Sequence, residues 1–192
     1  QLLSILLNDT EGYADSDEFK KDVEEMLAFF VNLDPVDQFA FLASSNNYYE
    51  GVTQKEVEAF YKKMASINDP RPISYGLNSK LVKENGKVKE KVWKSGGMYS
   101  AAIDRIVEWL EKAEGVAAEP QKAIINSLVK YYRSGDLRQF DDYNIKWVQD
   151  TVSNVDFVNG FIEDYGDPLG RKASWESIVN FRDEQACHRT EV

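Results

Sequence analysis

The chain has 192 residues, 43% of them hydrophobic, and 33 acidic against 23 basic residues give a formal net charge of −10 at pH 7. This length and composition are typical of a folded globular domain, and the negative charge argues against a nucleic acid partner. No apolar run approaches the ~20 residues that cross a bilayer, so we expect no membrane partner either.

Helical spacing of apolar side chains dominates the first third of the chain. It predicts a helix over residues 15–33, which Asp34-Pro35 ends while starting a shorter one. A polar, aromatic loop follows over residues 44–51. Thr53 and Glu56 then form a capping box, which predicts a helix reaching Met64.

The clearest strand signal surrounds Asn85-Gly86, the preferred pair for a tight hairpin turn. Residues 73–83 and 87–94 are the expected strands. Six lysines crowd this hairpin: Lys80, Lys83, Lys87, Lys89, Lys91 and Lys94. Such charges are typical of a solvated edge that resists pairing with other strands, and the alternative is a patch that binds anions.

Three helices are expected next, over residues 98–113, 120–134 and 137–149. Ser134-Gly135-Asp136 has the residue types of a C-cap, a turn and an N-cap, so the last two helices should fold back on each other. Beyond them the periodicity changes to two, which predicts strands over residues 155–165 and 175–183. Helices combined with antiparallel strands indicate the α+β class.

The single Cys and the single His exclude several kinds of active site. A zinc site needs three or four ligands, and an H-E-x-x-H helix needs two His alone. Cys187 and His188 are adjacent, so on a strand they would point to opposite faces and form a poor nucleophilic pair. We therefore assign no metal-ligating residue in this chain.

Residues 158–170 carry the strongest functional signal. Glu163 and Tyr165 lie two residues apart in a strand-like run, so they should project from the same side, about 6.5 Å apart along the backbone. A carboxylate and a hydroxyl so placed could hold a substrate ammonium and polarise a carbonyl. They could also be two polar residues at a strand end, and the segment alone leaves both interpretations open.

The segment over residues 160–170, G-F-I-E-D-Y-G-D-P-L-G, resembles the G-F-I-E-x-Y-x-D-P-x-G signature of the dipeptidyl peptidase III family of zinc metallopeptidases. Further stretches are similar to its bacterial members: residues 47–53, 75–79, 140–143, 147–150 and 172–191. The resemblance covers residues 44–192. Residues 1–43 form a helical segment without a clear counterpart, which we expect to share one domain with the rest.

The resemblance implies a two-lobed enzyme that removes dipeptides from the N-terminus of short peptides. This chain would be much of its lower lobe, where helices accompany a small β-barrel, and the strands would form part of that barrel. By the family motif, Glu163 would bind the substrate's α-ammonium. Tyr165 would be catalytic, donating a hydrogen bond to the scissile carbonyl and its oxyanion.

Neither zinc motif of the family occurs in this sequence. We therefore expect a fragment of a zinc-dependent exopeptidase that binds no metal and is inactive alone. Its partners would be a short peptide and the zinc-binding lobe of the same parent polypeptide. The alternative is a non-catalytic peptide-binding or structural module derived from that lobe. The compartment stays open between cytoplasm and periplasm.

Overall fold

The computed structural model describes residues 47–65 and 68–190, together with Lys21. The chain divides after Phe41, and all described residues except Lys21 belong to the second unit, Leu42–Val192. The helices expected between residues 15 and 43 lie outside the described residues, apart from Lys21, which is helical. That residues 1–43 share one domain with the rest stays a prediction.

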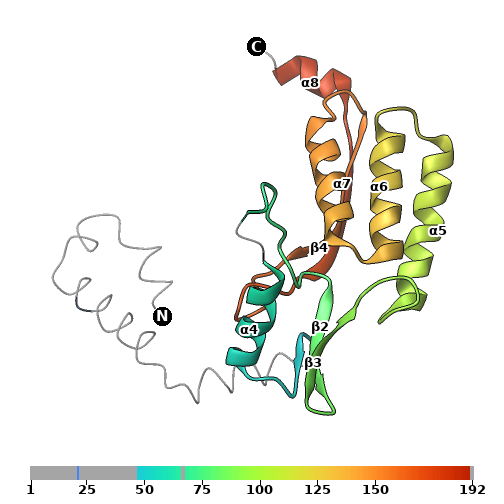
Figure 1. The fold of residues 1–192 in the computed structure, drawn as a ribbon. Helices are drawn as coiled ribbons and strands as arrows, with labels where there is room; N and C mark the ends of the chain where they lie inside the picture. Colours follow the sequence, from blue (N-terminus) through green and yellow to red (C-terminus); the bar gives the residue numbers. More distant parts are fainter. Residues whose placement is uncertain (1–20, 22–46, 66–67, 191–192) are drawn as a thin grey trace. The chain divides into compact units, whose positions relative to one another are not determined.

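The described elements mix helices with two small sheets (Figure 1). In chain order they are β1 (Tyr49–Glu50), α4 (Gln54–Met64), β2 (Ser79–Glu84), β3 (Lys87–Val92), α5 (Ser100–Val116), α6 (Gln121–Ser134), α7 (Leu137–Gln149), β4 (Val155–Glu163), β5 (Ser174–Phe181) and α8 (Glu184–Thr190). One sheet has the order β1-β2-β3, and the other is the antiparallel pair β4-β5. Among the described strands neither sheet closes on itself, so the expected part of a small β-barrel is not confirmed.

The hairpin turn and the helix before it form as their local chemistry predicts, but strand β2 begins at Ser79 and not at residue 73, because residues 75–78 form a turn. The Thr53 hydroxyl accepts the Glu56 amide while the Glu56 carboxylate accepts the Thr53 amide, which completes the capping box of α4. Asn85 and Gly86 both have positive φ, 50° and 76°, as a tight hairpin turn between β2 and β3 requires.

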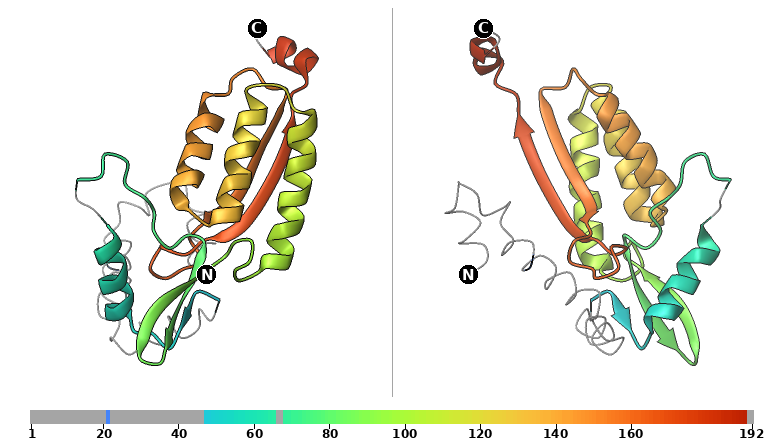
Figure 2. Two further views of the ribbon diagram at one scale, coloured as in Figure 1. Left: turned by 45° about the vertical axis from the view of Figure 1, so that its right-hand side comes forward. Right: turned by 90° about the vertical axis from the view of Figure 1, so that its left-hand side faces the viewer.

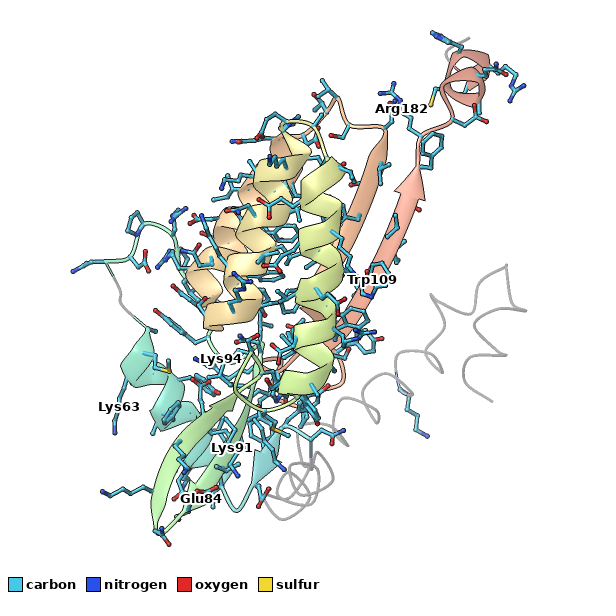
Figure 3. All side chains as sticks on the ribbon, turned by 90° about the vertical axis from the view of Figure 1, so that its right-hand side faces the viewer. Lys63, Glu84, Lys91, Lys94, Trp109 and Arg182 are labelled. Atoms are coloured by element: carbon cyan, nitrogen blue, oxygen red, sulfur yellow. The ribbon has the colours of Figure 1, made fainter. Side chains whose placement is uncertain are left out.

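Carboxylates accompany the hairpin lysines. Glu84 lies 2.5 Å from the ammonium of Lys89 and 2.7 Å from that of Lys91. Figure 3 labels Glu84 and Lys91 on the hairpin. Lys80 pairs with Glu50 and Lys83 with Glu56. Because four of the six lysines have acidic partners, the hairpin fits the solvated edge better than an anion-binding patch.

Helices α5, α6 and α7 lie side by side over one face of the β4-β5 pair (Figure 2). The expected turn joins α6 to α7: Gly135 adopts φ 71°, and the Asp136 side chain accepts the Arg138 amide. An added Cβ at Gly135 would lie 2.5 Å from Val92 Cγ1, so this turn also needs glycine for its close approach to β3. The Asn78 side chain donates to the Gly135 carbonyl at 3.0 Å, which ties the hairpin sheet to the helical layer.

Three features of the C-terminal part differ from the sequence prediction. Strand β5 spans Ser174–Phe181 and not residues 175–183. Strand β4 ends at Glu163 and not at residue 165, because the chain turns there. Cys187 and His188 lie in helix α8 and not on a strand. Neighbouring residues on a helix are ~100° apart around the axis, so this correction still leaves them without the facing arrangement of a nucleophilic pair.

Strand β5 exposes several large apolar side chains, including Ile178, Val179 and Phe181. No helix among the described residues is both long and apolar enough to cross a bilayer.

Candidate functional site

Glu163 lies at the very end of β4. It pairs with Ser174 of β5 beyond a bulge that separates it from Phe161. The Ser174 hydroxyl donates to the Glu163 carbonyl at 3.3 Å, which fixes the backbone at the strand end. Earlier in the strand, Gly160 allows β4 to approach α7, because an added Cβ would lie only 2.7 Å from a ring carbon of Phe140.

Tyr165 lies in the turn that follows β4. The Asp167 amide donates to the Asp164 carbonyl at 2.9 Å, which closes the turn around Tyr165. The Tyr165 side chain is 84% exposed, whereas Glu163 is partly buried. The expectation of an extended strand through Tyr165 is wrong by two residues, so alternation along a strand no longer places the two side chains on one face. The structure still puts both at the same end of β4.

Asp167 is buried directly behind this turn, with an exposure of 4%. Its Oδ2 accepts hydrogen bonds from the Tyr49 hydroxyl at 2.7 Å and from the amides of Arg171 and Lys172 at 2.9 and 2.8 Å. Its Oδ1 accepts the Leu169 amide at 3.1 Å. Four donors therefore converge on one carboxylate, which satisfies a buried charge that would otherwise be costly.

Lys172 is fully buried and points into the hairpin sheet. Its ammonium donates to the hydroxyls of Tyr61 and Ser79, the latter at 2.9 Å. Both hydroxyls in turn donate to Glu90 Oε1, which lies 3.8 Å from the ammonium. Burial lowers the pKa of Lys172 to about 8, and the nearby carboxylates of Glu90 and Asp167 only partly offset that effect.

Tyr48 lies on the other side of the turn. An added Cβ at Gly166 would lie 3.5 Å from the Tyr48 hydroxyl, which places that hydroxyl beside the turn. Burial first, and then the charges of Asp167 and Tyr165, raise the pKa of Tyr48. The Tyr48 ring also lines an open, mostly apolar pocket of about 440 Å³, together with Trp93, Phe161, Ser174 and Trp175 among others. Tyr48, beside the turn, and Ser174, which pairs with Glu163, thus connect the end of β4 to this pocket, whereas Glu163 and Tyr165 are not among the residues that line it.

Sequence reasoning missed the buried groups of this site. Asp167 lies in a Gly-Asp-Pro stretch that reads as an ordinary turn, and Lys172 follows a glycine and an arginine, where a lysine is normally exposed. The pairing of Tyr49 with Asp167 spans 118 residues, which no local pattern reveals.

The residues that the structure describes do not fit a zinc ion. Among them, no three His, Cys, Asp or Glu side chains gather closely enough to hold a metal. A zinc ion of the kind that the resemblance implies would need ligands from outside these residues, and the assignment of no metal ligand to this chain stays a prediction.

Comparison with known proteins gives one consistent result. Residues 32–191 match the model of peptidase family M49. Dipeptidyl peptidase 3 of Rattus norvegicus is 26% identical over 153 residues, which is 76% of this chain and 20% of that protein. Dipeptidyl peptidase 3 of Homo sapiens is 31% identical over 84 residues, which is 43% of this chain and 11% of that protein. The chain thus spans about a fifth of the length of the curated relatives it matches.

Two solved structures share the fold. Dipeptidyl-peptidase III from Corallococcus sp. strain EGB aligns with a TM-score of 0.56 at 21% identity, over 76% of this chain and 26% of that one. The protein of the same name from Caldithrix abyssi aligns with a TM-score of 0.57 at 20% identity, over 74% of this chain and 26% of that one. With most of its length matched by the family model, this chain belongs to peptidase family M49.

Proposed function

We propose that this chain is the substrate-binding part of a zinc-dependent dipeptidyl peptidase, which removes dipeptides from the N-terminus of short peptides. One observation carries the proposal: in a chain of this peptidase family, Glu163 and Tyr165 lie at one strand end, next to a turn held by the buried Asp167. A longer protein would supply the metal and its ligands.

The two side chains have different roles in this proposal. The Glu163 carboxylate would bind the free α-ammonium of a peptide, since a charge-assisted hydrogen bond is among the strongest that a site can offer. The Tyr165 hydroxyl would donate to the carbonyl oxygen of the bond that is cut, where negative charge develops. The high exposure of Tyr165 supports this role, because its hydroxyl is open to a ligand.

We expect the purified chain alone to bind zinc only in trace amounts and to release no dipeptide. Its single His and the lack of a ligand cluster among the described residues are the physical reasons. Elemental analysis after dialysis and an assay with a dipeptidyl arylamide would measure both properties. One zinc per chain, or arylamide cleavage that resists further purification, would refute this part of the proposal.

Peptide binding tests the role of Glu163 directly. We expect the chain to bind a short peptide with a free N-terminus at least about tenfold more tightly than the same peptide after N-acetylation, because an ion-assisted hydrogen bond contributes ~1.5–3 kcal/mol. In Glu163→Gln this preference should vanish, as followed by NMR titration of the labelled chain.

Glu176→Gln is the matched control. Glu176 is another partly buried carboxylate on the same β4-β5 pair, opposite Gly160. This variant should keep the wild-type preference. Equal affinities of the wild-type chain for the free and the acetylated peptide would contradict the proposed role of Glu163.

A non-catalytic peptide-binding or structural module derived from the same lobe is the second candidate. The coding sequence that follows Val192 separates the two. An H-E-x-x-G-H motif downstream would support the peptidase, and a stop codon at that point would favour the module.

A further inference from the structure

The turn that carries Tyr165 is short and is fixed at both ends. On one side Glu163 is held in β4 by its pairing with Ser174. On the other side Asp167 is buried, only four residues further along the chain. Three residues connect these points, so a shift of Asp167 must move the Tyr165 backbone relative to Glu163.

The contacts of Asp167 lead away from β4 to the other sheet. Its side-chain hydrogen bond is to the hydroxyl of Tyr49 in β1, a residue that is itself only 4% exposed. Burial, and then the hydrogen bond to Asp167, raise the pKa of Tyr49, so this hydroxyl keeps its proton and remains a donor at neutral pH. The position of the turn is thus set by a contact between β1 and the segment after β4.

A second attachment lies just beyond. The Lys172 amide is one of the donors to Asp167, while its side chain reaches Tyr61 in α4 and Ser79 in β2. The Ala173 amide donates to the Leu77 carbonyl at 3.0 Å. The segment from Asp167 to Ala173 is therefore attached to the hairpin side of the unit at several points, and Asp167 is the one nearest to Tyr165.

We propose that Asp167, held by the Tyr49 hydroxyl, is a positioning residue that sets where the Tyr165 turn lies relative to Glu163 and thereby gives the site its selectivity for a free N-terminus. This inference rests on the proposed function. It adds to that function two buried residues, Tyr49 and Asp167, to which the proposed function assigns no contact with the peptide. Their effect on binding passes through the turn.

The test compares two buried tyrosines in the complete chain. Tyr49→Phe removes one hydroxyl from Asp167 and leaves the three backbone donors in place. Tyr143→Phe is the control, since Tyr143 is equally buried but its hydroxyl donates at 3.4 Å to the Phe157 carbonyl, well before the strand end. Asp167→Asn should disturb the turn more than Tyr49→Phe. The side-chain NH₂ of Asn would be a donor at the position of Oδ2, toward which three donors already point.

The first measurement is the ratio of dissociation constants for the N-acetylated and the free peptide. We expect Tyr49→Phe to lower this ratio about fivefold, a coupling of ordinary size between contacting residues, while Tyr143→Phe stays within about twofold of wild type. A purely structural role would weaken binding of both peptides alike and leave the ratio unchanged, which would overturn the inference.

The second measurement needs no ligand. Backbone ¹⁵N relaxation of Asp164, Tyr165 and Gly166 should show increased motion in Tyr49→Phe and wild-type motion in Tyr143→Phe. Unchanged relaxation in both Tyr49→Phe and folded Asp167→Asn would overturn the inference, whatever the ratio of peptide dissociation constants is. A wild-type chain without any preference for the free peptide would instead overturn the proposed function, so the two failures are distinguishable.

Discussion

Replacing Tyr165 by Phe in a longer, active form of the protein is expected to lower kcat by about 10²–10³-fold. The change removes one hydroxyl from an exposed ring in the turn after β4 and leaves the ring itself in place. A donor aimed at the developing oxyanion contributes mainly in the transition state, so kcat should fall far more than peptide affinity. Steady-state kinetics with a dipeptidyl arylamide, together with binding of an uncleaved peptide, would measure the two effects.

The matched control for this experiment is Tyr99→Phe. Tyr99 is also an exposed tyrosine of the same unit, with 51% exposure; it directly precedes α5 and is one of the residues that line the apolar pocket. Its hydroxyl is assigned no role in the reaction, so kcat should be unchanged. If Tyr165→Phe keeps kcat and only raises KM, Tyr165 binds the substrate and does not stabilise the transition state.

The second large effect concerns the buried Lys172. We expect the free energy of unfolding of the wild-type chain to rise by about 2 kcal/mol relative to Lys172→Met between pH 7 and pH 10. The pKa of this lysine is about 8 in the folded chain against a usual value of 10.5. Between these values the unfolded chain holds more protons than the folded one, so raising the pH favours folding. Urea unfolding of both variants at several pH values would measure the difference.

Comparing wild type with Lys172→Met cancels the titration of groups that lie away from Lys172. The buried tyrosines Tyr131 and Tyr132 have raised pKa values and favour unfolding above pH 10, but both chains contain them. Lys122→Met, which replaces an exposed lysine of α6, should follow the wild-type pH dependence. A constant difference between wild type and Lys172→Met across this range would show that Lys172 is not desolvated as the structure indicates.

Elements defined by neighbours in sequence could be predicted well. The capping box of α4, the Asn85-Gly86 hairpin and the Gly135 turn each depend on contacts within a few residues, and all three are confirmed. The family resemblance is confirmed too. The end of β4 was placed two residues late, because the turn at Asp164 depends on Asp167 and its partners.

Contacts between distant residues could not be predicted in this way. Strand β1 has only two residues, Tyr49 and Glu50, and it exists because it pairs in parallel with β2. Burial of Lys172 depends on Tyr61, Ser79 and Glu90, which arrive from three different elements. Sequence periodicity contains no information on contacts between residues that are distant in the chain. It therefore could not identify Asp167 and Lys172 as buried residues of the candidate site.

The long separation between Tyr49 and Asp167 also bears on the order in which the chain folds. Hairpin β2-β3 and the α6-α7 pair close over a few residues and can form early, whereas the Tyr49–Asp167 contact closes a loop of 118 residues, with a correspondingly larger loss of chain entropy. The surroundings of Tyr165 are then among the last parts to be completed. Damage to β1, near the opposite end of the described chain, would therefore reach the candidate site through the contact between Tyr49 and Asp167.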